Sequence, residues 1–196
     1  MSFGISKKDK KTKDAMTTKF EKIKDKVLLF AAASNSGRND DRAYPAKLPE
    51  VFAIHAAFGG GGAWKNNPGP YRTGSNFSTL GMYVEAPHAG GTTKRVSGTS
   101  VAAPIAAAIA ALVLEFCRQP FVSIKKPERL KHKRGMEQIF SQMYNRFDAA
   151  RAAQEEDYFY LRPWLFMAMK QSDDDESAAR LRVAIAINEA LGSLEY

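Results

Sequence analysis

The sequence predicts an α/β fold in which a parallel sheet is flanked by helices. Two short, continuously apolar runs, VLLFAAA at residues 27–33 and VFAIHAA at 51–57, are typical of strands buried on both faces, as in a parallel sheet covered by helices. A long, alanine-rich apolar run over residues 101–116 predicts a buried helix. Apolar strands and helices that follow one another in this way indicate a layered α/β core.

The segment before the first strand, residues 5–26, is expected to form an amphipathic helix. It is rich in lysine, and its apolar residues Met16, Phe20, Ile23 and Val27 recur at spacings of four, three and four. This spacing places the four side chains on one face of a helix. We therefore expect that face to pack against the sheet.

The segments between these elements are expected to be loops, with one further strand. The stretch SNSGRNDDR after the first apolar run is a cluster of turn-forming residues, and two prolines in YPAKLPE favour an extended loop. Residues 58–81 are rich in Gly, Pro and Asn and show no helical period, whereas MYVEAP at 82–87 predicts a third strand. Pro104 falls in the first turn of the apolar helix, where proline is tolerated.

The chain beyond Cys117 differs in composition and pattern: a basic, proline-containing linker is followed by segments with helical periodicity. One helix is predicted by apolar residues at helical spacing: Met136, Ile139, Phe140, Met143 and Phe147. After an aromatic stretch broken by Pro163, the segment from Ser172 onward predicts a last helix, with Ser172 as a candidate cap and acidic residues in the first turn. We expect residues 1–117 to form one domain portion and 118–196 a helical extension.

The formal net charge of +8 raises the possibility of nucleic-acid binding. Much of the excess lies in two lysine-rich stretches, KKDKKTK near the beginning and IKKPERLKHKR at 124–134. Neither has interleaved aromatic residues or a nucleic-acid motif, so solvated charged surfaces are the favoured interpretation. Nucleic-acid binding is kept as a disfavoured alternative, which predicts binding that weakens steeply with salt.

The remaining compositional signals favour a soluble, cytoplasmic chain without a cofactor. A single cysteine, Cys117, excludes an internal disulfide and fits a reducing compartment. The beginning of the chain carries charges where a secretory signal has an apolar region. The apolar run 101–114 is shorter than the roughly 18 residues that a membrane span needs.

Ser100 lies at the mouth of the apolar helix, in the sequence VSGTSVAAP, and two interpretations fit it. Serine before an apolar run is a common helix cap. Alternatively, Ser100 is a nucleophile, because the free N–H groups and positive dipole at a helix N-terminus would stabilise an oxyanion formed there. Gly98 removes side-chain bulk beside the serine and would let a substrate or another backbone approach.

Asn35 is the second candidate for a chemical role. It follows the first buried strand in SNSG, where asparagine is commonly a turn residue. Its amide would instead donate a hydrogen bond to an oxyanion if the fold brings it close to Ser100. The two interpretations stay open at the level of local sequence.

Four segments of the chain resemble the subtilases, the subtilisin-like serine endopeptidases. They are AAASNSG, YPAKLPEVFAIHA, FSTLGMYVEAP and SGTSVAAPIAAAIAAL, and they occur in the order and approximate spacing of the C-terminal half of that family's catalytic domain. The last segment matches every fixed position of the family's nucleophile motif Gly-Thr-Ser-x-Ala-x-Pro. The resemblance covers residues 1–117 and implies a subtilisin-like parallel sheet flanked by helices.

The resemblance also implies roles for particular residues. Ser100 corresponds to the nucleophile, and Asn35 corresponds to the asparagine of the family's oxyanion hole. The segment MSFG resembles the strand whose backbone pairs with the peptide substrate, which implies this role for Ser2, Phe3 and Gly4. The implied reaction is hydrolysis of peptide bonds.

The Asp and His that complete the subtilase triad have no counterpart in this sequence, because in that family both precede the strand that MSFG resembles. His55 lies within a predicted strand and is expected to be packed, His88 matches no motif of a catalytic base, and His132 lies in a basic run and is expected to be solvated. Loss of the serine or the histidine costs subtilisin about 2 × 10⁶ in kcat. We therefore expect this chain alone to be inactive.

The partners implied are a polypeptide substrate or the missing N-terminal half of the domain, with no membrane. Without its first strands, the sheet is expected to have an exposed edge and exposed core surface. A sequence truncated before the Asp and His explains the pattern. A non-catalytic subtilase-like pseudopeptidase that binds polypeptide is the alternative.

Overall fold

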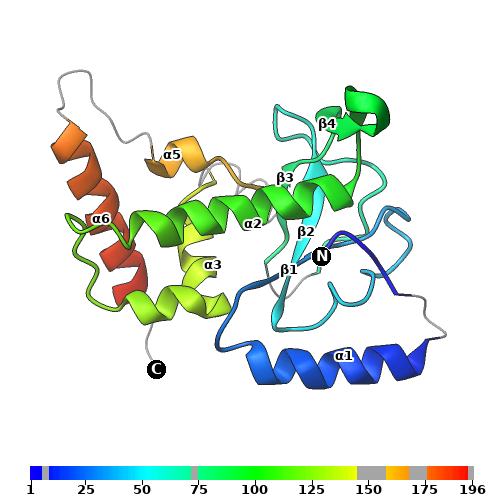
Figure 1. The fold of residues 1–196 in the computed structure, drawn as a ribbon, viewed down its shortest axis with the longest axis horizontal. Helices are drawn as coiled ribbons and strands as arrows, with labels where there is room; N and C mark the ends of the chain where they lie inside the picture. The colour runs from blue at the N-terminus through cyan, green and yellow to red at the C-terminus, as the bar shows by residue number, and fades with distance from the viewer. Residues whose placement is uncertain (6–8, 72–74, 145–157, 168–175, 194–196) are drawn as a thin grey trace.

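The structure is a computed structural model that describes residues 1–5, 9–71, 75–144, 158–167 and 176–193. Along the described chain a helix comes first, a series of strands follows, and the other long helices come after these strands, as Figure 1 shows. The elements are α1 (Lys10–Ile23), β1 (Leu29–Ala32), β2 (Val51–Ala57), β3 (Phe77–Leu80), β4 (Val84–His88), η1 (Ala89–Gly91), β5 (Thr92–Val96), α2 (Thr99–Phe116), η2 (Pro127–Lys131), α3 (Lys133–Ser141), β6 (Phe159–Tyr160), α5 (Pro163–Met167) and α6 (Glu176–Gly192).

The central sheet has the strand order β1-β2-β3-β6, and every pair of neighbours is parallel. The strand predicted at 51–57 is confirmed over its whole length, and the strand predicted at 27–33 is confirmed over Leu29–Ala32. Both are buried along their entire length, as their continuous apolar sequence requires. The predicted α/β fold with a parallel sheet flanked by helices is therefore confirmed.

The strand predicted at 82–87 is confirmed over residues 84–87, but it is not part of the central sheet. The sheet takes its third strand from residues 77–80, within the stretch predicted to be a loop, whereas 82–87 lies mostly in β4. β4 pairs antiparallel with β5 in a separate two-stranded hairpin, most of whose residues are exposed. The segment FSTL contains two polar residues, Ser78 and Thr79, and it is buried because it pairs with β2 and β6.

The two faces of the sheet carry two different apolar clusters. On one face, Phe30 and Phe52 stack with their ring centroids 4.8 Å apart, in a cluster that includes Ile54 and the buried side of α2. On the other face, alternate strand residues such as Val51 pack with Phe20 of α1. The alternation of side chains along a strand assigns each set to its own helix.

Helix α2 confirms the predicted buried helix, and Pro104 lies close to its beginning. It is two residues longer at its N-terminus than expected. Among the helices that the structure describes, it is the one that is long and apolar enough to cross a membrane by length and composition. Here it packs across β1, β2 and β3, as a core helix does. Seven of its 18 residues are buried.

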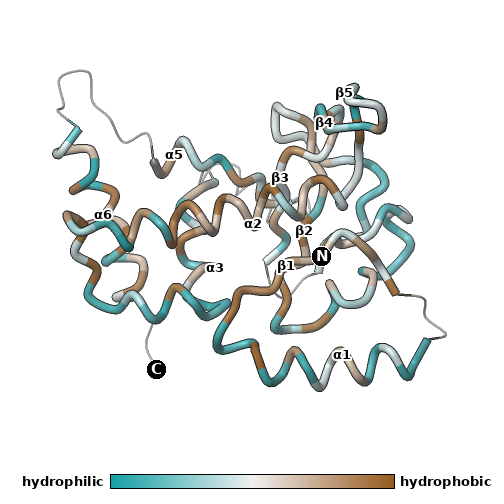
Figure 2. Tube along the Cα trace, viewed as in Figure 1, coloured by the Kyte–Doolittle hydropathy of each residue, from teal (hydrophilic) through white to brown (hydrophobic). Residues whose placement is uncertain are grey.

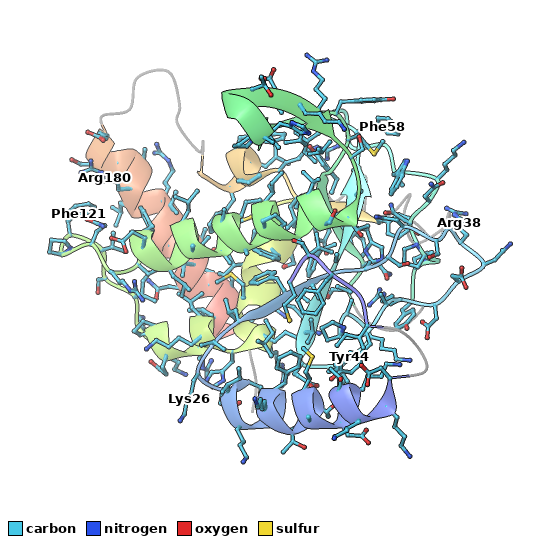
Figure 3. The ribbon with its side chains drawn as sticks, turned by 45° about the vertical axis from the view of Figure 1, so that its right-hand side comes forward. Lys26, Arg38, Tyr44, Phe58, Phe121 and Arg180 are labelled. Atoms are coloured by element: carbon cyan, nitrogen blue, oxygen red, sulfur yellow. The ribbon has the colours of Figure 1, made fainter. Side chains whose placement is uncertain are left out.

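Helix α1 confirms the predicted amphipathic helix within residues 5–26. The Asp9 carboxylate caps it by accepting a hydrogen bond from the Thr12 N–H at 3.0 Å, and Phe20 is its buried residue. Val27, which the spacing assigned to the same face, lies beyond the helix and is 45% exposed. Tyr44, labelled in Figure 3, reaches α1 and donates a hydrogen bond to the Lys13 carbonyl at 2.8 Å.

The part of the chain after Cys117 packs into the same core as α2. The predicted helix around 136–147 is observed as α3, with its apolar residues Met136, Ile139 and Phe140 fully buried; Phe147 lies outside the described residues. Buried Arg129 donates a hydrogen bond to the Leu191 carbonyl at 2.7 Å and so joins η2 to α6. The last predicted helix is observed as α6 with Glu176 in its first turn, whereas Ser172 lies outside the described residues.

Candidate active site

Ser100 is the second residue of α2, and its hydroxyl is not the cap of that helix. The N-cap position is occupied by Gly98, which has no side chain to offer. Ser100 is partly buried, and neither its hydroxyl nor its N–H forms a hydrogen bond with any residue that the structure describes. The interpretation of Ser100 as a helix cap was therefore wrong. Its free N–H is one of the unpaired donors that a helix N-terminus provides.

Asn35 lies directly against this helix end, although 64 residues separate it from Thr99. Its side-chain oxygen Oδ1 accepts hydrogen bonds from the Thr99 N–H at 2.9 Å and from the Thr99 hydroxyl at 3.0 Å. Asn35 Nδ2 has no partner among the described residues, and Asn35 is exposed. With Oδ1 held twice, the –NH₂ end of the amide is left available as a donor.

Two glycines allow this close approach. Gly98 has φ of 137°, and a Cβ at this position would lie 3.1 Å from Asn35 Nδ2. The Gly98 N–H donates to the Gly81 carbonyl at 2.7 Å, and a Cβ on Gly81 would lie 2.6 Å from the Cβ of Ala56. Side chains at these positions would separate the N-terminus of α2 from the C-terminal ends of β2 and β3. The carboxyl ends of three parallel strands therefore converge on the beginning of α2, where sites of α/β proteins commonly lie.

The segment Ser2–Gly4 lies beside the same strand that leads to Asn35. The Met1 amino group donates to the Phe30 carbonyl at 2.6 Å, the Ala32 N–H donates to the Met1 carbonyl at 2.9 Å, and the Ile5 N–H donates to the Tyr44 carbonyl at 3.0 Å. Ser2, Phe3 and Gly4 are exposed between these anchors, and no described residue bonds to their backbone groups. Their backbone N–H and C=O groups are therefore open to a partner.

A cavity of about 270 Å³ is lined by Ser34 and Ser36, the chain neighbours of Asn35, but not by Asn35 itself. Its walls come from Gly4 and Ile5 on one side, from Ser34 and Ser36 on either side of Asn35, and from the segment around Ala43. Asp41, which also lines it, is held by a hydrogen bond from the Tyr71 hydroxyl, and this bond lowers the pKa of the carboxyl group below its ordinary value. Of the candidate residues, Gly4 lines this open cavity, and Ser2, Phe3, Asn35 and Ser100 do not.

None of the three histidines makes a hydrogen bond with Ser100. His55 is fully buried, and its Nδ1 lies 3.0 Å from the Phe77 carbonyl. Burial, with a smaller contribution from the positive charge of Arg42, lowers the pKa of His55 to about 3. His88 ends the exposed strand β4, and His132 lies 3.5 Å from Asp25. The expectation that His55 is packed is confirmed.

Sequence reasoning missed the supporting roles of Thr99 and Gly81. Thr99 is 1% exposed and fixes the amide of Asn35 through both its N–H and its hydroxyl. Its position inside the Gly-Thr-Ser motif was the available signal. In the part of the chain that the structure describes, no group of three or more His, Cys, Asp or Glu residues could hold a metal ion.

Comparisons with known proteins agree with this architecture. The profile described as "Subtilase family" matches residues 1–133. The structure of the prenylagaramide maturation protease PagA aligns with a TM-score of 0.58 at 20% identity, over 97% of this chain and 60% of that one. The structure of the patellamide maturation protease PatA aligns with a TM-score of 0.57 at 22% identity, over 100% of this chain and 62% of that one.

The likeness to these structures is a likeness of fold, and the chain spans about 60% of their length. A further match, to the PatG macrocyclase domain, has a TM-score of 0.51 at 23% identity and covers 59% of this chain and 35% of that one. No curated protein sequence matches the chain.

Proposed function

The chain belongs to the subtilase family, whose profile matches residues 1–133, and we propose that it forms the nucleophile-bearing part of a serine endopeptidase domain. The observation that carries the proposal is the double hydrogen bond from Thr99 to Asn35 Oδ1. It holds an amide donor next to the residue that precedes Ser100. Two structural relatives are named as maturation proteases, which favours a polypeptide as the substrate.

In the proposed reaction, Ser100 Oγ attacks the carbonyl carbon of a peptide bond. A histidine takes the proton from the hydroxyl and returns it to the leaving amine. The carbonyl oxygen becomes an oxyanion, which accepts hydrogen bonds from the Ser100 N–H and from Asn35 Nδ2. Both donors lack partners among the described residues, so neither must break a bond to serve the transition state.

The proposal assigns the triad Asp and His to polypeptide outside this sequence. A serine hydroxyl is a poor nucleophile without an adjacent base, and none of the three histidines of this chain bonds to Ser100. We further propose that residues 1–117 correspond to the peptidase portion and 118–196 to a helical extension that shares its core. Alone, the chain would keep the oxyanion donors and lose most of the rate.

The substrate is proposed to bind along Ser2, Phe3 and Gly4. An extended peptide can add to an open strand edge through backbone hydrogen bonds, with its side chains in neighbouring pockets. The cavity lined by Gly4, Ser34 and Ser36 lies between this segment and the loop after β1, so it is the proposed site for a side chain of the bound peptide.

The test is covalent labelling with a fluorophosphonate probe of the protein as isolated from its source. We expect Ser100→Ala to abolish labelling, because the probe reacts with an activated serine. Ser97→Ala is the matched control, since Ser97 is exposed three residues away and accepts a hydrogen bond from the Tyr83 N–H. Labelling that persists in Ser100→Ala would show that the nucleophile is elsewhere.

A wild-type protein that is never labelled would favour the alternative, a non-catalytic subtilase-like module that binds polypeptide. The mass of the native polypeptide that contains the Ser100 peptide shows whether the Asp and His come from the same chain or from a second one. A mass well above 21.6 kDa would place them on the same chain. A mass of 21.6 kDa together with labelling would require a second polypeptide.

A further inference from the structure

Two aromatic side chains, Phe58 and Tyr83, are exposed beside the candidate active site and contact each other. Phe58 is 41% exposed and Tyr83 is 65% exposed. Their ring centroids lie 6.4 Å apart, with an angle of 43° between the ring planes. Because aromatic rings gain much free energy when they leave water, an exposed pair of rings is a favourable surface for a further apolar group.

This aromatic pair lies where the chain passes from the sheet to the beginning of α2. Phe58 directly follows β2, and Tyr83 lies between β3 and β4. The Tyr83 N–H donates a hydrogen bond at 2.9 Å to the hydroxyl of Ser97, which precedes Ser100 by three residues. In Figure 1 the hairpin that contains β4 stands at this end of the sheet, next to the beginning of α2, and Figure 3 labels Phe58 close to the hairpin. The aromatic pair is therefore continuous with the candidate active site.

The backbone of Tyr83 is strained. Its φ is 57°, in the left-handed region that glycine adopts readily and that is unfavourable for a residue with a bulky side chain. A glycine at this position would relieve the strain but would lose the ring. Strain of this kind clusters at active sites and ligand-binding sites, where a particular side chain is needed. The conformation of Tyr83 therefore indicates a role for its ring.

Phe58 is held in place by a tight turn. Its N–H donates a hydrogen bond to the Gly62 carbonyl at 2.9 Å, and its carbonyl accepts one from the Gly61 N–H at 2.8 Å. Tyr83 is likewise fixed by its bond to Ser97. Side chains on such a fixed backbone lose little freedom when a ligand binds, so the aromatic pair is preorganised.

We propose that Phe58 and Tyr83 form a subsite that binds a large apolar side chain of the polypeptide substrate, preferably an aromatic one. This inference rests on the proposed function, in which one half of the peptide lies along Ser2–Gly4. That segment adjoins β1, whereas Phe58 and Tyr83 follow β2 and β3. Since the strand order is β1-β2-β3, a peptide that runs from Ser2–Gly4 across Ser100 reaches the aromatic pair with its other half.

The chemistry of the pair favours an apolar side chain over a cation. A third ring can approach the two tilted rings in edge-to-face or offset geometry, and its contact removes apolar surface of all three from water. A lysine or arginine side chain could instead form a cation–π contact, but such contacts are weak at exposed sites. We therefore expect selectivity for Phe, Tyr and Trp.

The test is the cleavage of a random-sequence peptide library by the protein as isolated from its source, with the cleavage sites mapped by mass spectrometry. We expect aromatic residues to be enriched at one position close to the scissile bond. For two peptides that differ only at this position, Phe should give a kcat/KM about tenfold higher than Ala, at the low end of the discrimination by apolar pockets. Absence of aromatic enrichment, or enrichment of Lys or Arg in its place, would overturn the proposal.

Variants then show whether the preference comes from the aromatic pair. Tyr83→Gly removes the ring and relieves the strained φ, so in urea unfolding it should be at least as stable as the wild type. It should nevertheless lower the Phe-to-Ala ratio of kcat/KM about three- to fivefold, and Phe58→Ala should do the same. Tyr83→Phe keeps the ring and should keep the ratio.

Phe121→Ala is the matched control, because Phe121 is 58% exposed but lies beyond α2, and it should not change the ratio. An unchanged ratio in both Tyr83→Gly and Phe58→Ala would refute the subsite.

Binding of the same library to immobilised Ser100→Ala protein separates this inference from the proposed function. Cleavage without aromatic preference would leave the proposed function standing and refute the subsite. If no peptide is cleaved but aromatic peptides are retained, and Tyr83→Gly abolishes their retention, the subsite stands and catalysis is refuted. Neither cleavage nor retention would refute both.

Discussion

Helices α1 and α2 cover opposite faces of one sheet but are built in opposite ways. Helix α1 is hydrophilic except along one side, buries Phe20 and is capped by the Asp9 carboxylate. Helix α2 is apolar throughout and has glycine at its N-cap, so no side chain closes its N-terminus. Figure 2 shows this contrast, with α1 mostly teal and α2 mostly pale or brown.

The difference separates a helix that only covers the sheet from one that also carries a candidate site. A cap satisfies the free N–H groups of a helix and so removes them from any chemistry. At α2 the Thr99 N–H is used to hold Asn35, and the Ser100 N–H stays free. The helix with the stronger apolar character is thus left with an open N-terminus, where its backbone donors can serve an oxyanion.

The largest expected effect is at this open end. Asn35→Ala should lower kcat by about 10²–10³, with little change in KM, because the amide acts on the oxyanion and only weakly on the bound substrate. The measurement is steady-state peptide hydrolysis by the protein from its source. Asn39→Ala, an exposed asparagine in the same loop, is the control and should leave kcat unchanged. An unchanged kcat in Asn35→Ala would remove this residue from the oxyanion hole.

His55 is a polar residue buried within strand β2, and its protonation gives the second prediction. Its ring lies 4.6 Å from that of Tyr158, between β2 and the C-terminal part of the chain, and its Nε2 has no hydrogen-bond partner in the described structure. Because burial and Arg42 lower the pKa of His55 from 6.5 to about 3, folding requires the neutral imidazole. Its contribution to stability is complete above pH 6.5 and is lost as the pH falls toward 3.

By pH 5 the free energy of unfolding should therefore fall by about 2 kcal/mol relative to pH 7. Urea unfolding of the wild type and of His55→Leu between these pH values measures the effect, because the variant lacks the titrating group. His132→Leu is the control, since the His132 side chain is 42% exposed beside Asp25, whereas His55 is fully buried. An equal pH dependence in wild type and His55→Leu would contradict the assignment.

The helices and strands that have a clear local sequence pattern were predictable. The segment VFAIHAA, apolar except for His55, gave β2 correctly, and the four-three-four spacing gave the buried side of α1 with Phe20. Strand β3 was missed because FSTL is short and follows a long stretch of turn-forming residues, so its burial comes from pairing with β2 and β6. A strand of this kind is specified by its neighbours more than by its own composition.

The sequence identified the residues of the candidate site, but it did not predict which of them form hydrogen bonds with one another. The motif around Ser100 and the turn containing Asn35 are visible in the sequence, but the bond between Asn35 and Thr99 joins residues 64 positions apart. Local preference favoured a cap for Ser100, and the fold overrides it because Gly98 takes that position with φ of 137°.

The smallest expected effect comes from giving α2 the kind of cap that α1 has. Gly98→Ser would normally stabilise a helix, because serine accepts a hydrogen bond from the first turn. Here the φ of 137° is unfavourable for any side chain, and the new Cβ would lie 3.1 Å from Asn35 Nδ2. We therefore expect the substitution to destabilise the protein.

Gly90→Ser is the comparison, because Gly90 also has a positive φ, of 77°, but a Cβ there meets nothing within 4 Å. Gly98→Ser should cost about 1 kcal/mol more than Gly90→Ser in urea unfolding, because Gly98 combines the contact with Asn35 with φ of 137° and ψ of 169°, a conformation that only glycine adopts readily. If Gly98→Ser instead raises stability, the N-terminus of α2 can accept a cap without disturbing Asn35. The fold would then not require an uncapped N-terminus at α2. The proposed chemistry would be the remaining reason for a glycine at this position.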